Sequence, residues 1–410
     1  MIRKLILIRQ KQIYAFVLVT IVLFILSQRF NVLIYSVYKD SVRSYSTSLD
    51  IQSWIKDRQS TCDGNFISYG HQFAVLKNVI IPSYSESFYL PCKQFSLKHY
   101  QFQYGKEGTH MNSWIKNVHP YKKNVKLSPI SIEKMKVLVA VKRYEYLNVY
   151  HTMTDWYNVF LVSTLLNIPS DTIDILLYDN STGYLDNTWD KLFGRVIRIN
   201  NVTGTQSITA EILVWNILGY ESPLNYHSTP EVPYIENFRK FFITKYGISD
   251  KDKLNCNSVS ISFLLRRDYV NHARIKSVSR KIANEKELYN VLKKHYPSAI
   301  INVYSFENYS IHYQLNAITK TDILISMHGA GLSHILFLPS HAGVIELFPL
   351  YWVKFPGMIH FEAFARWRHL KYSSWQNLNP NNEVDKYLTY IPPTVILQHV
   401  EKVYTQICPH

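Results

Sequence analysis

The chain has 410 residues, of which 47% are hydrophobic and 18% are charged, with 13 glycines and 16 prolines. This composition excludes a disordered or collagen-like chain, and the length is enough for two domains. The net charge of +15 favours an anionic partner such as nucleic acid, anionic lipid or a phosphorylated substrate. Nucleic acid is not expected, because the sequence holds neither a long basic block nor a nucleic-acid-binding motif.

The chain begins with a basic segment followed by a long apolar run. Residues 1–12 hold four basic residues and no acidic ones, and residues 13–26 read IYAFVLVTIVLFIL. This run spans about 21 Å, short of a hydrocarbon core of about 30 Å, but Phe30 extends it and Arg29 can snorkel. We expect a cytosolic tail over 1–12 and a transmembrane signal anchor over 13–30. A cleaved signal peptide and a buried helix are the alternatives, although no small-x-small cleavage site follows the run.

This orientation places the rest of the chain in the lumen of the secretory pathway, with residues 31–60 as a stem. Beyond the anchor lie four cysteines, an even number that predicts two disulfides with three possible pairings. They are Cys62, Cys92, Cys256 and Cys408. Cys62–Cys92 is the local pairing, and no cysteine spacing is typical of a zinc site.

Three N-glycosylation sequons agree with a lumenal location. They begin at Asn180, Asn201 and Asn308. The last four residues, Ile-Cys-Pro-His, are not a KDEL-type retrieval signal. We therefore expect a single-pass type II protein of the Golgi membrane, with the endoplasmic reticulum as the alternative.

From residue 137 onward, short apolar runs alternate with longer amphipathic stretches. The runs predict strands at 137–141, 173–178, 195–199, 212–215, 259–265, 300–304, 323–326 and 344–347. The stretches predict helices at 154–166, 235–246, 285–295 and 312–319. Short apolar strands between helices are typical of parallel sheets buried on both faces. The polar segment 247–257 divides the chain into two α/β domains, 61–246 and 247–410, with a cleft between them.

The first candidate site follows the strand at 137–141. Glu145, His151 and Asp155 lie near one strand-to-helix junction, and His151 and Asp155 share a helix face if both are helical. A His or a carboxylate there can remove a proton from an attacking hydroxyl. The alternative is a salt-bridged helix start with Thr154 or Asp155 as the N-cap.

The second candidate site follows the strand at 259–265. Arg266 and Arg267 come directly after this strand, and Arg280 follows further along. Arginine at the carboxyl end of a buried strand faces the crevice where α/β sheets bind ligands, and its planar fork matches phosphate oxygens. The alternative is a solvated surface arginine.

The third candidate site is the segment DILISMHGAGLSH, which starts at residue 322. A buried strand runs into a glycine-rich turn and a short helix, an arrangement that offers backbone N–H groups to phosphate. The turn residues are His328, Gly329, Ala330, Gly331 and Leu332. Glu346 lies in the next strand, where a carboxylate can accept both ribose hydroxyls. A tight β–α turn without a ligand is the alternative.

Together these segments resemble glycosyltransferase family 61. The matching pieces are EYLNVYHTMTDWYN from Glu145, LDNTWDKLF from Leu185, LLRRDYVNHAR from Leu264, SRKIANEKEL from Ser279 and HGAGLSHILFLPSHAGVIEL from His328. The first three are most similar to the β-1,2-xylosyltransferases of N-glycan cores. The last piece is equally similar to the EGF-domain-specific O-linked N-acetylglucosamine transferases. Because those enzymes are typically soluble proteins with a retrieval tail, the expected anchor favours the xylosyltransferases.

The resemblance implies a GT-B-like pair of Rossmann-type domains and an inverting transfer from a UDP-sugar to a glycoprotein. UDP-xylose and UDP-N-acetylglucosamine are the candidate donors, held by the C-terminal domain. Among the residues of the first site, Asp155 is then the favoured base, with His151 as its positioning partner. A metal requirement is left open, since Asp171, Asp174 and Asp179 are adequately explained as turn residues. A non-catalytic lumenal glycan-binding protein is the alternative from another class.

Overall fold

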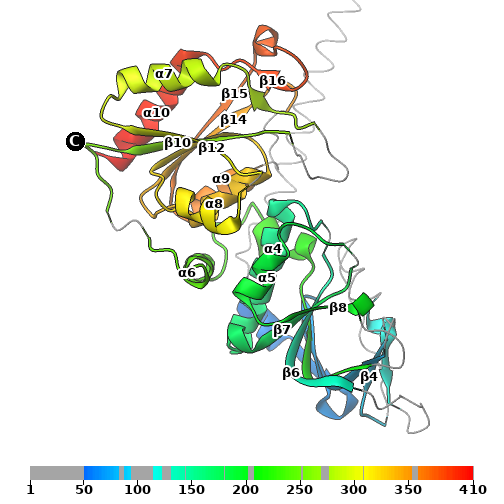
Figure 1. The fold of residues 1–410 in the computed structure, drawn as a ribbon. Coiled ribbons are helices and arrows are strands. Elements are labelled where there is room, and N and C mark those ends of the chain that lie inside the picture. The colour runs from blue at the N-terminus through cyan, green and yellow to red at the C-terminus, as the bar shows by residue number, and fades with distance from the viewer. Residues whose placement is uncertain are drawn as a thin grey trace, which may run out of the picture.

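The computed structural model describes residues 50–82, 87–93, 114–121, 131–143, 145–179, 181–201, 207–250, 253–268, 277–307, 309–352 and 359–409. The expected anchor at 13–30 and the sequons at Asn180 and Asn308 lie outside these residues. Within the described part of the chain, no helix is both long and apolar enough to cross a membrane. The described residues form two lobes, each built on its own sheet (Figure 1).

The first lobe is built on a nine-stranded mixed sheet. Its strands are β1 (Arg58–Thr61), β2 (Phe66–Tyr69), β3 (Phe73–Pro82), β4 (Phe88–Leu90), β5 (Val118–Pro120), β6 (Ser131–Val141), β7 (Ile173–Leu177), β8 (Val196–Arg198) and β9 (Ser207–Trp215). The order is β1-β2-β3-β9-β6-β7-β8, with β4 pairing with β3 and β5. Strands β9, β6, β7 and β8 are parallel, whereas β1, β2, β3 and β9 pair antiparallel.

The strands expected from 137 to 215 are confirmed, but the expectation of a parallel Rossmann-type sheet holds for only half of this lobe. The turns that join β1 to β2 and β2 to β3 are short, and parallel neighbours need a long crossover. Residues 50–60, expected to belong to a stem, form α2 (Ile51–Lys56) and most of β1. Ile51 and Trp54 are buried in the main core, so this segment is part of the folded lobe.

The helix α4 (Val149–Leu165) follows β6 and begins earlier than the sequence predicts. Asn148 is its N-cap, and its side-chain oxygen accepts a 2.9 Å hydrogen bond from the backbone N–H of Tyr150. Thr154 and Asp155, the alternative N-caps, therefore lie inside the helix. Residues 152–163 are all buried, as expected for a helix enclosed by the sheet on one side and the second lobe on the other. The lobe also contains α5 (Asn187–Leu192) and α6 (Ile235–Lys245).

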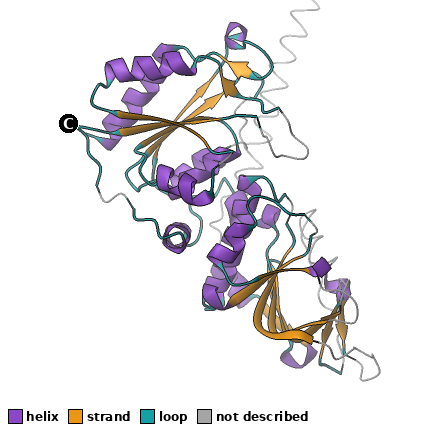
Figure 2. Cartoon of the chain, in the orientation of Figure 1, coloured by secondary structure: helices purple, strands orange, loops and turns teal. Residues whose placement is uncertain are grey.

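The second lobe is built on a five-stranded parallel sheet. Its strands are β10 (Ser260–Leu265), β12 (Ile300–Ser305), β13 (Ile323–Met327), β14 (Gly343–Phe348) and β15 (Lys371–Gln376), in the order β12-β10-β13-β14-β15. The helices α7 (Glu285–His295) and α10 (Pro393–Ile407) cover one face, and α8 (Ile311–Ile318), α9 (His360–Trp367) and the 3-10 helix η7 (Ala330–Phe337) cover the other (Figures 1 and 2). Two short strands, β11 (Lys281–Ile282) and β16 (Leu388–Thr389), pair separately. The strands and helices expected here are confirmed.

Buried arginines join the two lobes at the end of η7. Arg239 of α6 donates to the carbonyl of Leu338 at 3.0 Å, and Arg368 donates to the same carbonyl at 2.9 Å. These bonds satisfy carbonyl groups that a helix end leaves unpaired. The main hydrophobic core also runs continuously from α4 through α6 to η7 and α9. These hydrogen bonds and the shared core therefore hold the two lobes together at the base of the cleft.

Both disulfides expected from the cysteine count are present. Cys62 pairs with Cys92, as the local pairing predicted, and Cys256 pairs with Cys408. The second bond ties the start of the second lobe to the end of α10, across a separation of 152 residues. Closing so long a loop lowers the entropy of the unfolded chain.

Candidate active site

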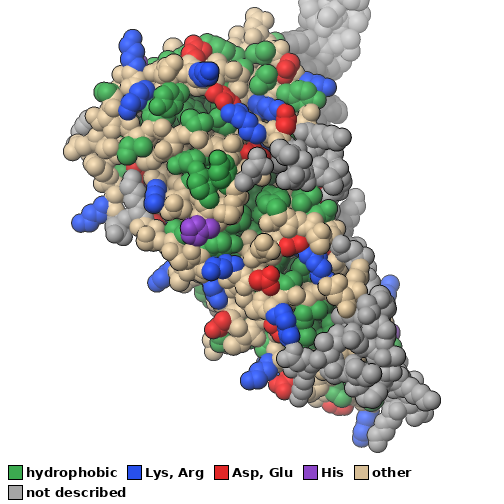
Figure 3. All heavy atoms as spheres, in the orientation of Figure 1, with side chains coloured by type: hydrophobic (Ala, Val, Ile, Leu, Met, Phe, Trp, Pro, Cys, Tyr) green, Lys and Arg blue, Asp and Glu red, His purple; other side chains and the backbone are tan. Residues whose placement is uncertain are grey.

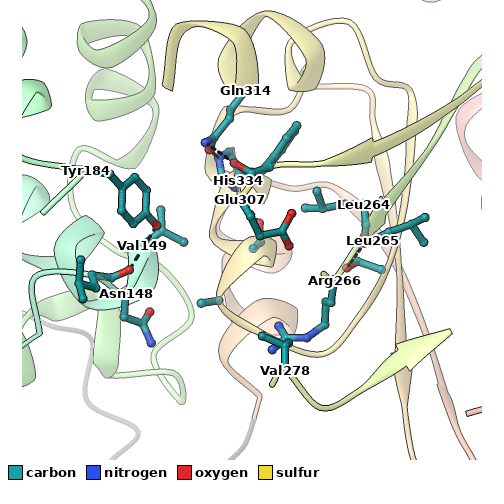
Figure 4. Close-up of a pocket in the computed structure, with 15 residues that line it drawn as sticks. Asn148, Val149, Tyr184, Leu264, Leu265, Arg266, Val278, Glu307, Gln314 and His334 are labelled. Atoms are coloured by element: carbon teal, nitrogen blue, oxygen red, sulfur yellow. Dashed lines mark hydrogen bonds between the residues drawn. The ribbon is translucent and has the colours of Figure 1, made fainter. Parts of the chain in front are cut away.

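A pocket of about 100 Å³ lies between the two lobes (Figure 4). The first lobe contributes the start of α4 and Tyr184, and the second contributes the carboxyl ends of β10 and β12 with the start of η7. The lining residues are Leu147, Asn148, Val149, Tyr184, Leu264, Leu265, Arg266, Val278, Phe306, Glu307, Gln314, Ser326, Ala330, Gly331 and His334. Ligands bind at the carboxyl ends of strands in open parallel sheets, so this pocket is the expected place for one.

Arg266 forms the cationic wall of this pocket. Its Nε donates a 3.0 Å hydrogen bond to the carbonyl of Ser279. A Cβ atom on Gly329 would lie 1.8 Å from Nη1 of Arg266. The sequence placed Gly329 in a turn that offers backbone N–H groups to phosphate. In the structure, the glycine makes room for the guanidinium group.

The two other predicted arginines lie elsewhere. Arg267 is exposed and forms a bidentate ion pair with Glu285 at the start of α7, with contacts of 2.5 and 2.6 Å. This ion pair offsets the positive charge of Arg267 at the protein surface. Arg280 places its guanidinium carbon 4.2 Å from the ring centre of Trp352, and its φ of 63° is uncommon for a residue with a side chain.

The glycine-rich turn is divided between the pocket and the core. Ala330 and Gly331 line the pocket, whereas Leu332 is completely buried in the main core. His334 was quoted in the segment but not selected, and the structure places it in the pocket. Its Nδ1 is 2.8 Å from the carbonyl of Gly331 and its Nε2 is 2.8 Å from Oε1 of Gln314 (Figure 4). Burial lowers the pKa of His334 to about 4, so the ring is neutral at pH 7.

His328 and Glu346 form a buried pair beside the pocket. Nδ1 of His328 is 2.6 Å from Oε1 of Glu346, and the hydroxyl of Tyr372 donates to Oε2 at 2.5 Å. Glu346 is only 2% exposed. Burial, and then the charge of Glu346, raise the pKa of Tyr372, so its hydroxyl keeps its proton. Both oxygens of Glu346 are thus engaged within the protein, where the sequence predicted a ribose contact.

Two further histidines that the sequence analysis missed gather next to His328. The ring centre of His360 lies 4.2 Å from that of His227 and 6.2 Å from that of His328. Burial, and then the charges of His360 and Arg366, lower the pKa of His227 to about 3. Burial, and then the charges of His328 and His151, lower the pKa of His360 to about 4. Neither histidine belongs to a motif, so no sequence signal identifies them.

The three residues predicted in the first lobe have very different surroundings. Asp155 is 1% exposed, and neither carboxylate oxygen has a hydrogen-bond partner among the described residues. A Cβ on Gly219 would lie 2.9 Å from Oδ1. Burial raises the pKa of Asp155 well above its usual value. His151 is only half-buried, and its ring contacts that of Tyr220 with centres 5.4 Å apart. Burial lowers the pKa of His151, and the charge of Glu145 opposes this effect.

Ion pairs hold the same strand-to-helix junction together. The side chain of Arg143, only 1% exposed, forms ion pairs of 2.6 Å with both Asp179 and Asp186. Asp179 is therefore a partner of arginine, and Asp174 is paired with Arg195 at 3.2 Å. Among the residues that the structure describes, no three His, Cys, Asp or Glu side chains form a metal-binding group.

The remaining predicted residue, Asn201, is exposed in a short 3-10 helix after β8, where a glycan would meet solvent. On the face shown in Figure 3, Lys and Arg side chains alternate with acidic ones instead of forming one basic patch. This distribution offers no continuous track for a nucleic-acid backbone on that face.

Two α/β lobes with a pocket between them, at the carboxyl ends of parallel strands, are typical of proteins that bind nucleotides or nucleotide-sugars. Residues 149–345 match the family Glycosyltransferase 61. This match covers a little under half of the chain. The matched residues include most of the pocket lining, from the start of α4 to η7.

Similar proteins come from two groups of enzymes. A β-1,2-xylosyltransferase of Oryza sativa subsp. japonica is 27% identical over 57% of this chain and 48% of its own length. One from Arabidopsis thaliana is 25% identical, over 65% of this chain and 54% of its own. An EGF domain-specific O-linked N-acetylglucosamine transferase of Mus musculus is 27% identical, over 60% of this chain and 47% of its own length. The chain spans about half the length of these relatives.

A solved oxidoreductase structure from Ralstonia solanacearum covers 67% of this chain and 92% of its own at 9% identity. Its TM-score of 0.20 carries no argument about fold or function.

Proposed function

We propose that this protein is a glycosyltransferase that moves a sugar from a UDP-sugar to a glycoprotein. The observation that carries the proposal is the pocket between the lobes, within the segment that matches the family, with Arg266 laid across Gly329. A guanidinium group in this position can bind the diphosphate and stabilise it as it leaves. The uridine then occupies the pocket between the two lobes.

The proposed acceptor is the N-glycan core, and the proposed product is a β-1,2-linked xylose. Relatives of both names match with similar identity, so identity does not separate the two groups. The expected anchor over 13–30 favours the xylosyltransferases and a type II protein of the Golgi membrane. An EGF-domain O-linked N-acetylglucosamine transferase is the second candidate, supported by relatives with that name.

We place the base of the proposed inverting step on His151. Asp155, the favoured candidate from sequence, is buried within α4 with a raised pKa, whereas His151 is half-buried and its ring contacts that of the exposed Tyr220. The acceptor oxygen bonds to the anomeric carbon while its proton passes to His151. The bond from that carbon to the phosphate oxygen breaks, and its electrons leave with UDP. Glu145, near His151, favours the imidazolium that forms.

The test is release of UDP by the purified full-length chain. UDP-xylose and UDP-N-acetylglucosamine are each supplied with an N-glycan core or with a folded EGF domain. We expect xylose transfer to the glycan core, and transfer of N-acetylglucosamine to the EGF domain would support the second candidate. A chain that binds glycans but uses neither donor would be a glycan-binding protein. Parallel reactions with a chelator show whether a divalent metal is needed.

A further inference from the structure

Glu346 is at the centre of a hydrogen-bonded chain across three neighbouring strands. His328 directly follows β13, Glu346 lies in β14 and Tyr372 lies in β15. The carboxylate is held on one side by Nδ1 of His328 and on the other by the hydroxyl of Tyr372. A ribose would have to reach a side chain that is only 2% exposed. This geometry does not fit a sugar-binding carboxylate.

The same chain fixes the ring of His328. An ionised carboxylate only accepts hydrogen bonds, so Nδ1 carries a hydrogen and donates it to Glu346. The ring stacks on Phe348, with centres 5.0 Å apart, and is flanked by Trp352 at 5.7 Å. Nε2 has no hydrogen-bond partner among the described residues. The imidazole therefore has one defined orientation and one nitrogen available to a ligand.

Two arginines lie near His328. Gly329, the next residue along the chain, is covered by the guanidinium of Arg266. Arg280 lies over the ring of Trp352, which in turn flanks His328. His360 adds a second imidazole at 6.2 Å. The guanidinium groups favour an anion, and a ring with hydrogens on both nitrogens can donate to a carboxylate on one side and to a phosphate on the other.

We propose that Glu346 is a positioning residue, which holds His328 so that Nε2 donates to the diphosphate of the UDP-sugar. Glu346 is then not a ligand of the ribose. This inference rests on the proposed function and adds a specific diphosphate contact to it. Tyr372 supports the same arrangement by occupying the second oxygen of Glu346.

The test compares three ligands by calorimetry on the full chain: UDP, uridine and 2′-deoxy-UDP. For His328→Gln we expect the affinity for UDP to fall about 10- to 100-fold while that for uridine stays unchanged, because one charge-assisted contact to phosphate is lost. Glu346→Gln is expected to weaken UDP about 10-fold and to leave the ratio of UDP to 2′-deoxy-UDP affinity unchanged. Tyr372→Phe should produce a smaller loss in the same direction.

His341→Gln is a matched control. His341 forms the other close histidine–carboxylate pair of this lobe, 2.7 Å from Asp322, which precedes β13 and so lies at the opposite end of the sheet. Its loss should alter none of the three affinities. Thermal unfolding shows which variants are folded, and if Glu346→Gln fails to fold, the other two variants carry the test.

The two possible failures are distinguishable. Unchanged UDP affinity in folded His328→Gln overturns the inference. So does a selective loss of discrimination against 2′-deoxy-UDP in Glu346→Gln, which would identify a ribose ligand. If the unmodified chain binds no UDP, the proposed function itself is wrong.

Discussion

Replacing Gly329 with alanine should displace Arg266 without unfolding the protein. The added Cβ would lie 1.8 Å from Nη1 and 2.7 Å from Cζ of Arg266, which is closer than non-bonded atoms approach each other. The group that must move is the end of a flexible side chain, so we expect the guanidinium to leave its place and the fold to persist. Losing its contact with the diphosphate should cost about 1.5–3 kcal/mol, or about 10- to 100-fold in UDP affinity.

The assay is calorimetric titration with UDP, alongside thermal unfolding. Arg266→Ala should weaken UDP binding by a similar factor, and the double variant should be little worse than either single one, because both remove the same contact. Gly247→Ala is the control. That glycine has a φ of +65° and open space around it, so the change should lower stability and leave UDP binding intact. Wild-type UDP affinity in Gly329→Ala, or additive losses in the double variant, would refute the reasoning.

Four other predictions test the first lobe and the topology. Burial raises the pKa of Asp155 in the folded state, so the folded protein loses stability as the pH rises through that pKa. In thermal unfolding, Asp155→Asn should be more stable than wild type at neutral pH and equally stable below about pH 4. Turnover should stay near normal, and a fall of about 100-fold would return the role of base to Asp155. His151→Gln should reduce turnover about 100-fold at saturating donor with UDP affinity unchanged, and normal turnover would exclude it as the base. Arg143→Met removes the buried partner of Asp179 and Asp186, which then keep only Arg198, and should cost about 1.5–3 kcal/mol in urea unfolding, whereas a loss under about 1 kcal/mol would contradict the ion-pair assignment. Glycosidase treatment should reduce the mass of the full-length protein while its N-terminus stays intact, and a mature chain that starts near residue 30 would refute the anchor.

The local pattern of the sequence determined most of the elements around the site. Residues 323–326 and 344–347 are continuous apolar runs, and the structure has β13 and β14 there because a strand buried on both faces needs such a run. The turn HGAGL between them was likewise identifiable, since glycines after a strand permit close approach of other groups. The antiparallel strands β1–β5 were not expected, because pairing between short strands depends on partners elsewhere in the chain.

Only the tertiary structure decided how the site residues are paired and buried. The sequence marked Glu346 and His328 as separate ligands of a nucleotide, but the register of β13 and β14 brings them together as a pair. The sequence also placed Asp155 near the reaction, and the packing of α4 against Gly219 buried it instead. His227 and His360 are 133 residues apart and meet because α9 packs against the loop before α6. Local periodicity depends on neighbours within a few residues, whereas burial, pairing and charge at the site depend on segments that only the fold brings together.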